Sequence, residues 1–258
     1  MKNSLSFLGT LSPEDKLLAG RVIEMAETAA EKYISKFTFF LDERQKALCK
    51  KVLASVCVED HLFFGGYDNA ERTVLGISAP YSPLSEEVFP FKALTFSFRE
   101  SDKLSHRDFL GCLMGLGIQR DTVGDIIVSD GRAVVFVYDT VAPLAEGIEK
   151  VGRVGVKVRE GFDLSVIPQK SFLPIEGTVA SLRLDSVAAL AFHISREKAA
   201  ALIRSGGIEL NYAVQYSADR KVEQGDVFSS RGRGKFRVEE IGSLTRKDRI
   251  HIKINKYA

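Results

Sequence analysis

The sequence lacks several features that mark common protein classes. Its 258 residues include three cysteines, Cys49, Cys57 and Cys112, an odd and widely spaced set that fits reduced thiols better than a disulfide framework. No run of about 18 apolar residues occurs, so no transmembrane helix is expected. The stretch after Met1 is polar and has no apolar signal-peptide core. We therefore expect a cytoplasmic protein without a membrane contact.

Motifs for nucleotide, methyl-donor or metal chemistry are missing as well. No G-x-G-x-x-G follows a predicted strand, and Gly232-Arg233-Gly234-Lys235 has neither the spacing nor the Ser/Thr of a P-loop. The four histidines have no metal-ligand spacing with the cysteines. We therefore expect no cofactor, no metal site and no catalytic residue.

No sign of charge dominates the whole chain, whose formal net charge is +2. The balance is uneven along the sequence, because residues 178–258 hold 15 Lys or Arg and 9 Asp or Glu, while residues 1–177 hold 21 and 25. A basic part on a neutral or acidic body indicates a polyanion-binding surface. Ordinary surface variation is the alternative explanation for a surplus of this size.

Helix signals dominate the first part of the chain. Ser12-Pro13-Glu14-Asp15 combines a capping Ser, a Pro at the first helical position and two acids, and it predicts a helix that runs to about Ile34. A spacing of four between apolar residues predicts a second helix over 42–56. Residues 1–60 are therefore predicted to form a helical N-terminal region.

A regular order of elements follows. Asp130-Gly131 between two alternating segments is a strong hairpin signal. Strands are predicted at 61–64, 73–77, 91–98, 125–129, 133–138 and 153–158, and helices at 107–116 and 141–150. From residue 91 on, the order is βαββαβ, which is typical of a ferredoxin-like or RNA-recognition-like domain, so residues 61–160 are predicted to form one. Many unrelated proteins share this order.

Turn-forming residues separate this domain from the last one. Segment 161–177 contains Pro168, Pro174 and Gly177 and is predicted to be a linker. In residues 178–258, apolar residues at helical spacing and the capping residue Ser195 predict two short helices, which begin near Leu184 and Ser195. Strands are predicted after them at 208–210, 227–230, 235–238 and 250–254. The fold class expected for the whole chain is α+β.

Cations stand where a stable helix prefers acids. Arg196 and Lys198 fall in the first turn of the second short helix of the last domain, and Arg183 stands at the start of the first, where the helix dipole disfavours positive charge. Cations beside free backbone N–H groups at a helix start form a good phosphate site. The alternative is that these side chains simply point into water.

Four basic residues alternate in the segment 231–237. In an extended chain Arg231, Arg233, Lys235 and Arg237 share one face, and the glycines between them allow close approach of a ligand. A row of four cations without an acid favours nucleic acid. An edge strand protected from aggregation by Lys and Arg is the alternative.

Together these features resemble a known RNA-binding domain. The matching residues keep the family spacing: Ser181-Leu182-Arg183-Leu184-Asp185, Ser195-Arg196, Ala199, Ile203, Gly206, Asn211, Gly225-Asp226 and Ser230-Arg231-Gly232. They resemble the S4 domain of ribosomal and RNA-modifying proteins, whose two short helices and following hairpin form a basic surface for structured RNA. The resemblance implies RNA contacts by the basic residues of that surface: Arg183, Arg196, Lys198, Arg204 and Arg231. Tyr212 departs from the pattern, which often has Gly there.

The resemblance continues upstream of that domain. Three segments carry it: 65–72 (GGYDNAER), 106–111 (HRDFLG) and 116–126 (LGIQRDTVGDI). They are similar to the bacterial YlmH family, which has a small helical N-terminus, an RNA-recognition-like middle domain and a C-terminal S4 domain. The resemblance implies ribosome-associated quality control, in which the protein works on the large ribosomal subunit and helps to hold peptidyl-tRNA during tail addition. RNA, as rRNA and tRNA, and the large subunit are the expected partners of a monomer.

Two sets of side chains could bring RNA to the middle domain. Phe136 and Tyr138 share one face of a strand, as Phe96 and Phe98 do in another, and could stack on bases, although large aromatics are more often core. Polar groups at the ends of helices and strands are the better candidates for RNA contact: Arg72, His106-Arg107 and Gln119-Arg120. Capping and pairing within the fold are the alternative for this second set.

Two other functions compete with non-catalytic RNA binding. Pseudouridine synthases use an Arg-Leu-Asp motif with a catalytic Asp, and Arg183-Leu184-Asp185 matches it. Here the triplet opens a predicted helix, where Asp favours the dipole, and the usual pattern of the catalytic domain is missing. A protein adaptor for cell division, docked through the N-terminal helices, is the second alternative, since the YlmH family is also linked to cell-division gene clusters.

Overall fold

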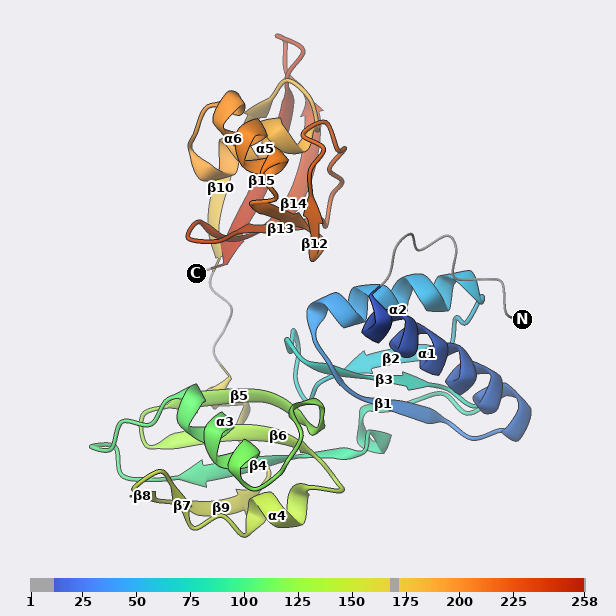
Figure 1. The fold of residues 1–258 in the computed structure, drawn as a ribbon, viewed down its shortest axis with the longest axis vertical. Helices are drawn as coiled ribbons and strands as arrows, with labels where there is room; N and C mark the ends of the chain where they lie inside the picture. The colour runs from blue at the N-terminus through green and yellow to red at the C-terminus, as the bar shows by residue number, and fades with distance from the viewer. Residues whose placement is uncertain (1–11, 168–171, 258) are drawn as a thin grey trace. The chain divides into compact units, whose positions relative to one another are not determined.

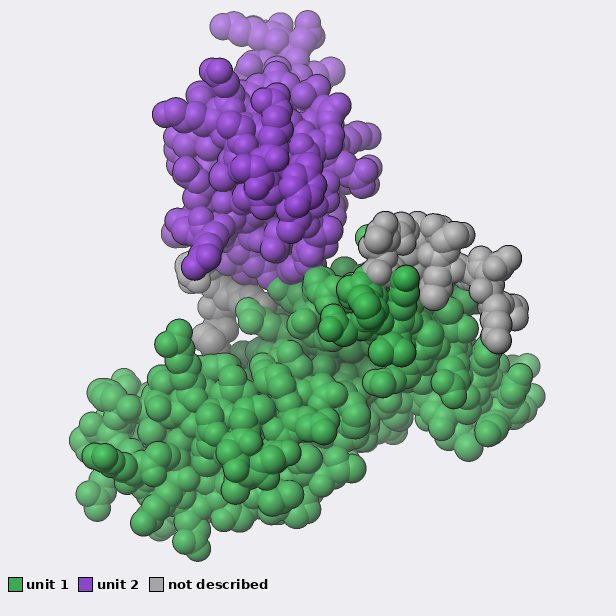
Figure 2. Space-filling view, viewed as in Figure 1, with its two compact units in different colours: residues 1–168 green, residues 169–258 purple. Residues whose placement is uncertain are grey.

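The computed structural model describes residues 12–167 and 172–257 of the chain. The chain divides into two compact units, residues 1–168 and 169–258 (Figure 2). The first unit holds two main sheets with their helices, and the second holds one sheet with two helices (Figure 1). The α+β class predicted from the sequence is confirmed. Residues 168–171 of the predicted linker lie outside the described residues.

Two helices open the first unit where their caps predict them. α1 spans Pro13–Lys32, and the Ser12 hydroxyl in front of it accepts a hydrogen bond from a backbone N–H of the first turn. α2 spans Glu43–Ser55 and is preceded by a capping box that Asp42 and Gln45 form. These caps satisfy N–H groups that a helix start otherwise leaves without partners, and both predicted helices are confirmed.

The N-terminal region also contains a sheet that the sequence prediction missed. β1 (Lys36–Leu41) follows α1 and pairs antiparallel with β3 (Thr73–Ile77), which pairs in turn with β2 (His61–Phe64). α1 and α2 pack on this sheet around a core that includes Val22 and Leu53. The prediction of a purely helical region that ends at residue 60 is therefore wrong, because β1 pairs with a strand from beyond that boundary.

The second sheet of this unit forms from a βαββαβ segment. Its main elements in chain order are β4 (Phe91–Ser97), α3 (His106–Gly115), β5 (Val123–Ser129), β6 (Arg132–Tyr138), α4 (Ala142–Glu146) and β9 (Lys157–Glu160). The strands are antiparallel in the order β5-β6-β4-β9. This is the split β-α-β arrangement that the sequence pattern predicts from residue 91 on.

Two predicted bounds differ from the structure in this segment. The helix predicted over 141–150 ends at Glu146, because Gly147 stops it and Lys150 already belongs to a strand. The strand predicted over 153–158 divides into the end of a short hairpin and the beginning of β9. Short elements complete the unit: the hairpin β7 (Lys150–Val151) and β8 (Val154–Gly155), and the single-turn helices η2 (Glu86–Val88), η3 (Arg120–Thr122) and η4 (Leu164–Val166).

The four-stranded sheet has different neighbours on its two faces. α3 and α4 cover one face around a core that includes Phe96. On the other face Val134 and Phe136 pack with Phe40 and Val74 of the three-stranded sheet, and both phenylalanines are at most 1% exposed. The two sheets thus share a core, which occupies part of the face that RNA-recognition domains use for base stacking.

The second unit is a six-stranded sheet with two short helices packed on it (Figure 1). Its elements in chain order are β10 (Phe172–Val179), α5 (Leu184–Phe192), α6 (Arg196–Arg204), β11 (Ile208–Leu210), β12 (Ala213–Gln215), β13 (Val227–Ser230), β14 (Gly234–Leu244) and β15 (Ile250–Tyr257). The sheet order is β10-β15-β14-β13-β11-β12. Phe192 of α5 packs on Phe228 and Phe236 of the sheet at ring-centre distances of 5.9 and 5.2 Å.

β10 corrects the predicted linker and domain boundary. All eight of its residues pair with β15. α5 approaches β10 so closely that a Cβ on Gly177 would lie 2.7 Å from Leu190 Cδ1. Residues 172–177, which the sequence assigned to a linker, therefore belong to the C-terminal fold. Pro174 is tolerated in β10 because this strand lies at the edge of the sheet.

Candidate nucleic-acid interface

Arg183 and Arg196 converge on one carboxylate at the start of α5. Arg183 Nη2 and Arg196 Nε lie 3.2 and 3.1 Å from Asp185 Oδ2, and Arg183 Nε and Ser186 Oγ each donate to Asp185 Oδ1 at 3.3 Å. The Asp185 side chain is 6% exposed, whereas those of Arg183 and Arg196 are 43% and 51% exposed. A buried acid therefore holds two guanidinium groups together at the surface, and the three groups keep a positive charge.

The two arginines keep Asp185 ionised although it is buried. Burial raises the pKa of a carboxyl group, but hydrogen bonds from Arg183 and Arg196 and their charges outweigh that effect and lower the pKa of Asp185 below its ordinary 3.8. A buried carboxylate bound by two guanidinium groups is poorly placed to attack a substrate. This geometry favours a structural role for the Arg183-Leu184-Asp185 triplet over a catalytic one.

The backbone N–H groups that open α5 already have partners. Leu184 N donates to Arg220 O at 2.8 Å, and Asp185 N donates to Ala218 O at 3.0 Å. The loop that carries these carbonyls therefore caps the helix. The prediction of a phosphate site made by free N–H groups is wrong for α5, and an anion bound here would depend on the guanidinium groups.

α6 carries the other predicted cations, at its two ends. Ser195 Oγ caps the helix by accepting a hydrogen bond from the Lys198 N–H at 3.3 Å, and the Lys198 side chain is exposed in the same turn as Arg196. Arg204 is exposed in the last turn, roughly 12 Å along the helix axis from Arg196, where a cation interacts favourably with the dipole. The structure therefore groups Lys198 with Arg196 and separates Arg204 from them.

The basic segment 231–237 is a turn followed by a strand. Arg231 and Arg233 are exposed in the turn between β13 and β14, and only Lys235 and Arg237 alternate along β14. The prediction that four cations share one face of a strand is therefore wrong. β14 lies between β13 and β15, so the edge-strand alternative does not hold either.

Aromatic rings position two cations of this segment. The guanidinium carbon of Arg233 lies 5.6 Å from the centre of the Phe192 ring, and Lys235 Nζ lies 5.1 and 4.9 Å from the ring centres of Tyr212 and Tyr257. These distances are typical of cation–π interactions. Tyr212 has a φ of 64°, the left-handed conformation that favours Gly in a two-residue hairpin turn. The departure from the S4 pattern at Tyr212 thus leaves the turn in place and puts a ring over Lys235.

Arg72 is engaged inside the first unit. Its Nε donates to Val123 O at 2.9 Å, and its Nη2 donates to Phe40 O at 3.0 Å and to Arg120 O at 3.3 Å. Burial and the charge of Arg120 lower the pKa of Arg72 to about 10, so the side chain stays charged at neutral pH. This guanidinium joins β1 to the start of β5. That structural role competes with the predicted RNA contact, which stays a prediction.

The segment 65–72, which carries the resemblance to YlmH, docks on β5 and β6. Asp125 of β5 accepts hydrogen bonds from the Tyr67 hydroxyl at 2.7 Å and from the N–H groups of the last two residues of the segment at 2.7 and 3.0 Å. Gly66 has a φ of 98°, and a Cβ there would lie 2.2 Å from Phe136 Cε1. The motif therefore builds the junction between the two sheets.

The other two basic residues predicted for the middle domain lie apart. Arg120 Nη1 donates to Val123 O at 2.6 Å, next to Arg72. Arg107 is exposed in the first turn of α3, which covers the opposite face of the sheet from the three-stranded one. The structure does not bring Arg72, Arg107 and Arg120 together into one surface, and RNA contact by Arg107 and Arg120 stays a prediction.

The aromatic side chains that could stack on bases lie in or against the core, with Phe98 and Tyr138 partly buried at its border. Phe96 and Phe136 are each 0% exposed, and the Phe136 ring packs on Tyr67 and Phe162 at ring-centre distances of 5.5 and 5.2 Å. The core alternative is confirmed for these two residues. Base stacking on Phe136 would require Phe162 and the N-terminal sheet to move away.

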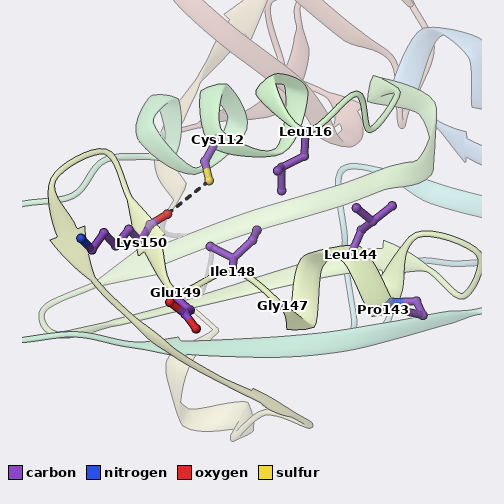
Figure 3. Close-up of a pocket in the computed structure, with 8 residues that line it drawn as sticks. All are labelled: Cys112, Leu116, Pro143, Leu144, Gly147, Ile148, Glu149 and Lys150. Carbon is purple, nitrogen blue, oxygen red and sulfur yellow. Dashed lines mark hydrogen bonds between the residues drawn. The ribbon is translucent and has the colours of Figure 1, made fainter.

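An open groove of about 560 Å³ lies between α3 and the segment that starts with α4 (Figure 3). Its lining is mainly apolar: Cys112, Leu116, Pro143, Leu144, Gly147, Ile148, Glu149 and Lys150. Cys112 Sγ donates to Lys150 O at 3.6 Å, and burial raises the pKa of this thiol. A thiol with a raised pKa is a poor nucleophile, and no histidine lines the groove to activate it.

Neither a membrane-spanning helix nor a metal-binding cluster is present in the part of the chain that the structure describes. Over residues 12–167 and 172–257, no helix is both long and apolar enough to cross a membrane. Within the same ranges, no group of three or more His, Cys, Asp or Glu side chains is arranged to hold a metal ion.

The fold and the site together define a class of protein. Proteins of this class combine three parts. A small α+β module shares a core with a βαββαβ domain, and a basic unit contains a buried acid that positions two arginines. Residues 91–162 match the family described as "Putative RNA-binding domain in YlmH".

One curated relative covers nearly the whole chain. Over 245 residues, 93% of this chain and 94% of the relative, the sequence is 32% identical to the "Ribosome-associated protein quality control protein P2" of Bacillus subtilis (strain 168). The chain belongs to the YlmH family. A solved structure, "Cell division protein ylmH from Streptococcus pneumoniae", matches with a TM-score of 0.51 and 22% identity over 60% of this chain and 95% of that one, which shows a shared fold.

Proposed function

We propose that the protein is a non-catalytic RNA-binding protein that acts on the large ribosomal subunit, next to a tRNA, in the quality control of stalled translation. The proposal is supported by the family match of residues 91–162 to an RNA-binding domain and by the ribosome-associated name of the Bacillus subtilis relative. It includes an S4-type role for the C-terminal unit, a monomeric protein and a cytoplasmic location.

The observation that carries the proposal is the pair of arginines held by Asp185. Both side chains are about half exposed, and one buried carboxylate fixes them. Guanidinium groups that are already positioned lose little conformational entropy when they bind a phosphate, and their planar fork matches phosphate oxygens. Lys198 and the turn residues Arg231 and Arg233 are further contacts in this proposal, and Arg204 contributes from the far end of α6.

The geometry of Asp185 also supports a role without catalysis. The acid that would serve a pseudouridine synthase is buried and bound by two guanidinium groups, and the groove beside α3 offers a thiol with a raised pKa and no histidine in its lining. Uridine isomerisation by the purified protein, lost in Asp185→Asn, would overturn this part of the proposal.

The test measures binding of the full chain to purified large and small ribosomal subunits over a series of salt concentrations. Arg183→Gln and Arg196→Gln are measured singly, because each leaves one guanidinium on Asp185. Each lost phosphate contact should lessen the log–log salt slope by about 0.7–0.9 and weaken binding by about 5–8-fold near 0.1 M salt. Arg246→Gln, in the turn before β15, removes the same charge and serves as the matched control.

The outcomes separate the parts of the proposal. Preference of the wild-type protein for the large subunit, with losses in Arg183→Gln and Arg196→Gln but not in Arg246→Gln, would support it. Preference for the small subunit would refute the ribosomal assignment and leave RNA binding intact. Unchanged binding by both arginine variants would remove the Asp185 site from the interface.

A further inference from the structure

The face of the four-stranded sheet that lies opposite α3 and α4 is divided into two halves. Alternate residues of each strand point to this face. At one end the residues are apolar and covered, as Val134 and Phe136 on β6 show with 0% exposure. Toward the other end of the same strands the facing residues become polar and exposed, and Arg132 on β6 is the first of them. The N-terminal sheet therefore covers only the apolar half.

Strand register places three cations in the uncovered half. Ser97 of β4 is the direct partner of Arg132 on β6 and of Lys157 on β9, and Thr95 is the partner of Arg159 on β9. Direct partners point to the same face. Val158, between the two cations of β9, packs with the helix-side core instead. Arg132, Ser97, Lys157 and Arg159, which we call the sheet strip, are all exposed on one face.

The spacing of the sheet strip suits a charged chain that runs across it. Neighbouring strands lie about 4.8 Å apart, so the backbones at Arg132 and Lys157 are separated by roughly 10 Å with Ser97 between them. Lys157 and Arg159 are two residues apart on one strand, roughly 7 Å. The strip therefore offers positive charge at three points around an exposed hydroxyl group.

The acids near the strip leave it positive. Hydrogen bonds from Ser165 are the main cause of the lowered pKa of Asp163, and Arg132 is close enough for its charge to lower this pKa further. Asp130, in the turn before β6, is paired with Lys103 at 3.1 Å. Glu160, the last residue of β9, points to the opposite face, where it pairs with Lys92 at 2.7 Å. Glu100 also lies near Arg132, because a Cβ on Gly131 would be 2.9 Å from Glu100 Cγ. The three cations of the strip thus outnumber the unpaired acids beside it.

Edge protection does not account for this arrangement. β9 is an edge strand, and Lys or Arg on an edge strand discourages pairing with other chains. Arg132, however, lies on β6, which is paired on both sides by β5 and β4. A cation at an inner position, in line with the cations of the edge strand, indicates a surface for a polyanion instead.

We propose that the sheet strip binds the phosphate backbone of RNA, as a second RNA-binding surface that is independent of Asp185 and its arginines. The inference rests on the proposed function and adds the place at which the first unit touches RNA. Because Phe136 is covered and the strip has no aromatic residue, the strip contacts phosphates and does not stack on bases. Binding through it is therefore insensitive to base sequence and sensitive to salt.

The test uses the full chain with fluorescent oligouridylate and oligoadenylate as probes. The strip variant combines Arg132→Gln, Lys157→Gln and Arg159→Gln, and the control variant combines Lys51→Gln, Lys150→Gln and Arg153→Gln, which remove the same charge from exposed positions elsewhere on the first unit. Loss of three contacts should lessen the log–log salt slope by about 2.1 and weaken binding on the order of 100-fold near 0.1 M salt. The loss should be equal for both probes, and the control should keep the wild-type slope.

A second measurement on the wild-type protein does not depend on the variants. Lysine acetylation should be slowed at Lys157 by either probe, but not at Lys150. Wild-type binding with an unchanged slope in the strip variant and no protection of Lys157 would overturn the inference and leave the proposed function standing. Absence of any wild-type binding to ribosomal subunits or to the probes would overturn both. A loss for one probe only would show base recognition and contradict a phosphate contact.

Discussion

The two units of this protein use arginine in opposite ways. In the first unit Arg72 and Arg120 donate to backbone carbonyls and hold β1, η3 and β5 together. In the second unit Arg183 and Arg196 meet a single buried carboxylate and remain about half exposed. In the first arrangement the guanidinium N–H groups are bound to backbone carbonyls of the protein. In the second arrangement the carboxylate fixes the guanidinium groups and leaves N–H groups exposed for a ligand.

The aromatic residues of the first unit, like its arginines, contact the protein itself. Phe136 stands where an RNA-recognition domain would display a ring, and here it fills the core between two sheets. The presence of Arg or Phe at a motif position therefore does not indicate whether the side chain faces RNA or the protein. The comparison predicts that substitutions in the first unit at these positions reduce stability, and that those in the second reduce RNA binding.

The largest expected effect is that of Phe136→Ala. Removing a fully buried phenylalanine should lower the free energy of unfolding of the first unit by about 3–5 kcal/mol. Urea denaturation measures this loss. Phe39→Ala on β1 is the control, because Phe39 is 39% exposed and its loss should cost much less. A stable Phe136→Ala protein that has lost RNA binding would instead show that the ring serves RNA.

Arg72→Ala should have the next largest effect. It removes three hydrogen bonds from a charged donor to carbonyls of β1, η3 and β5, and we expect a loss of about 2–3 kcal/mol in the stability of the first unit. Arg107→Ala, at an exposed position of α3, should change the unfolding midpoint little. If Arg72→Ala kept its stability and lost affinity for RNA, the contrast between the two units would fail at this residue.

Asp185→Asn should have a smaller effect, and one that depends on pH. The pKa of Asp185 is lowered in the folded protein, so its stabilisation is complete above the unfolded pKa of about 4 and is lost as the pH falls through the folded value. At neutral pH the variant should be about 1–2 kcal/mol less stable in the second unit. Near pH 3 the difference should shrink, which denaturation at both pH values would measure. A difference that persists in acid would mean that the charge of Asp185 is not what holds the arginines.

The smallest expected effect is that of Lys235→Gln. Lys235 Nζ lies between the rings of Tyr212 and Tyr257, and loss of the cation–π contacts should cost about 0.5–1 kcal/mol. Arg237→Gln, two residues along β14 on the same face, removes the same charge without a ring contact of this kind. Equal thermal midpoints for the two variants would show that the rings do not stabilise Lys235.

The sequence predicts best where local chemistry decides the structure. Ser12 and Asp42 are caps whose hydrogen bonds lie within one turn of the helix, and the turn at Asp130-Gly131 joins adjacent strands. β1 was missed because it pairs with residues more than thirty positions away. The sequence predicts a linker at β10 because Pro174 and Gly177 are turn signals. The strand forms at the edge of the sheet, and that position depends on pairing with the distant β15.

The candidate site shows the same limit. Sequence reasoning named Arg183 and Arg196 from their helix-start positions, but treated Asp185 as an acid that favours the dipole. Its side chain is instead the common partner of both arginines, and that contact depends on how α5 and α6 pack. The sheet strip was missed because Arg132 is far from Lys157 and Arg159 in the chain and meets them only through strand register. The alternation of Arg132, Val134 and Phe136 was the available signal.

The pairing of β10 with β15 has a consequence for how the second unit is made. β10 leaves the ribosome before α5, α6 and strands β11 to β14, yet β15 is its partner in the sheet. At typical rates of synthesis, the roughly seventy residues between them take about 4–14 s to add. During that interval β10 has been synthesised but its partner β15 has not. The edge of β14 that pairs with β15 is unpaired for the same reason. The sheet therefore closes late, and a chain interrupted before Ile250 would expose two strand edges that the finished protein conceals.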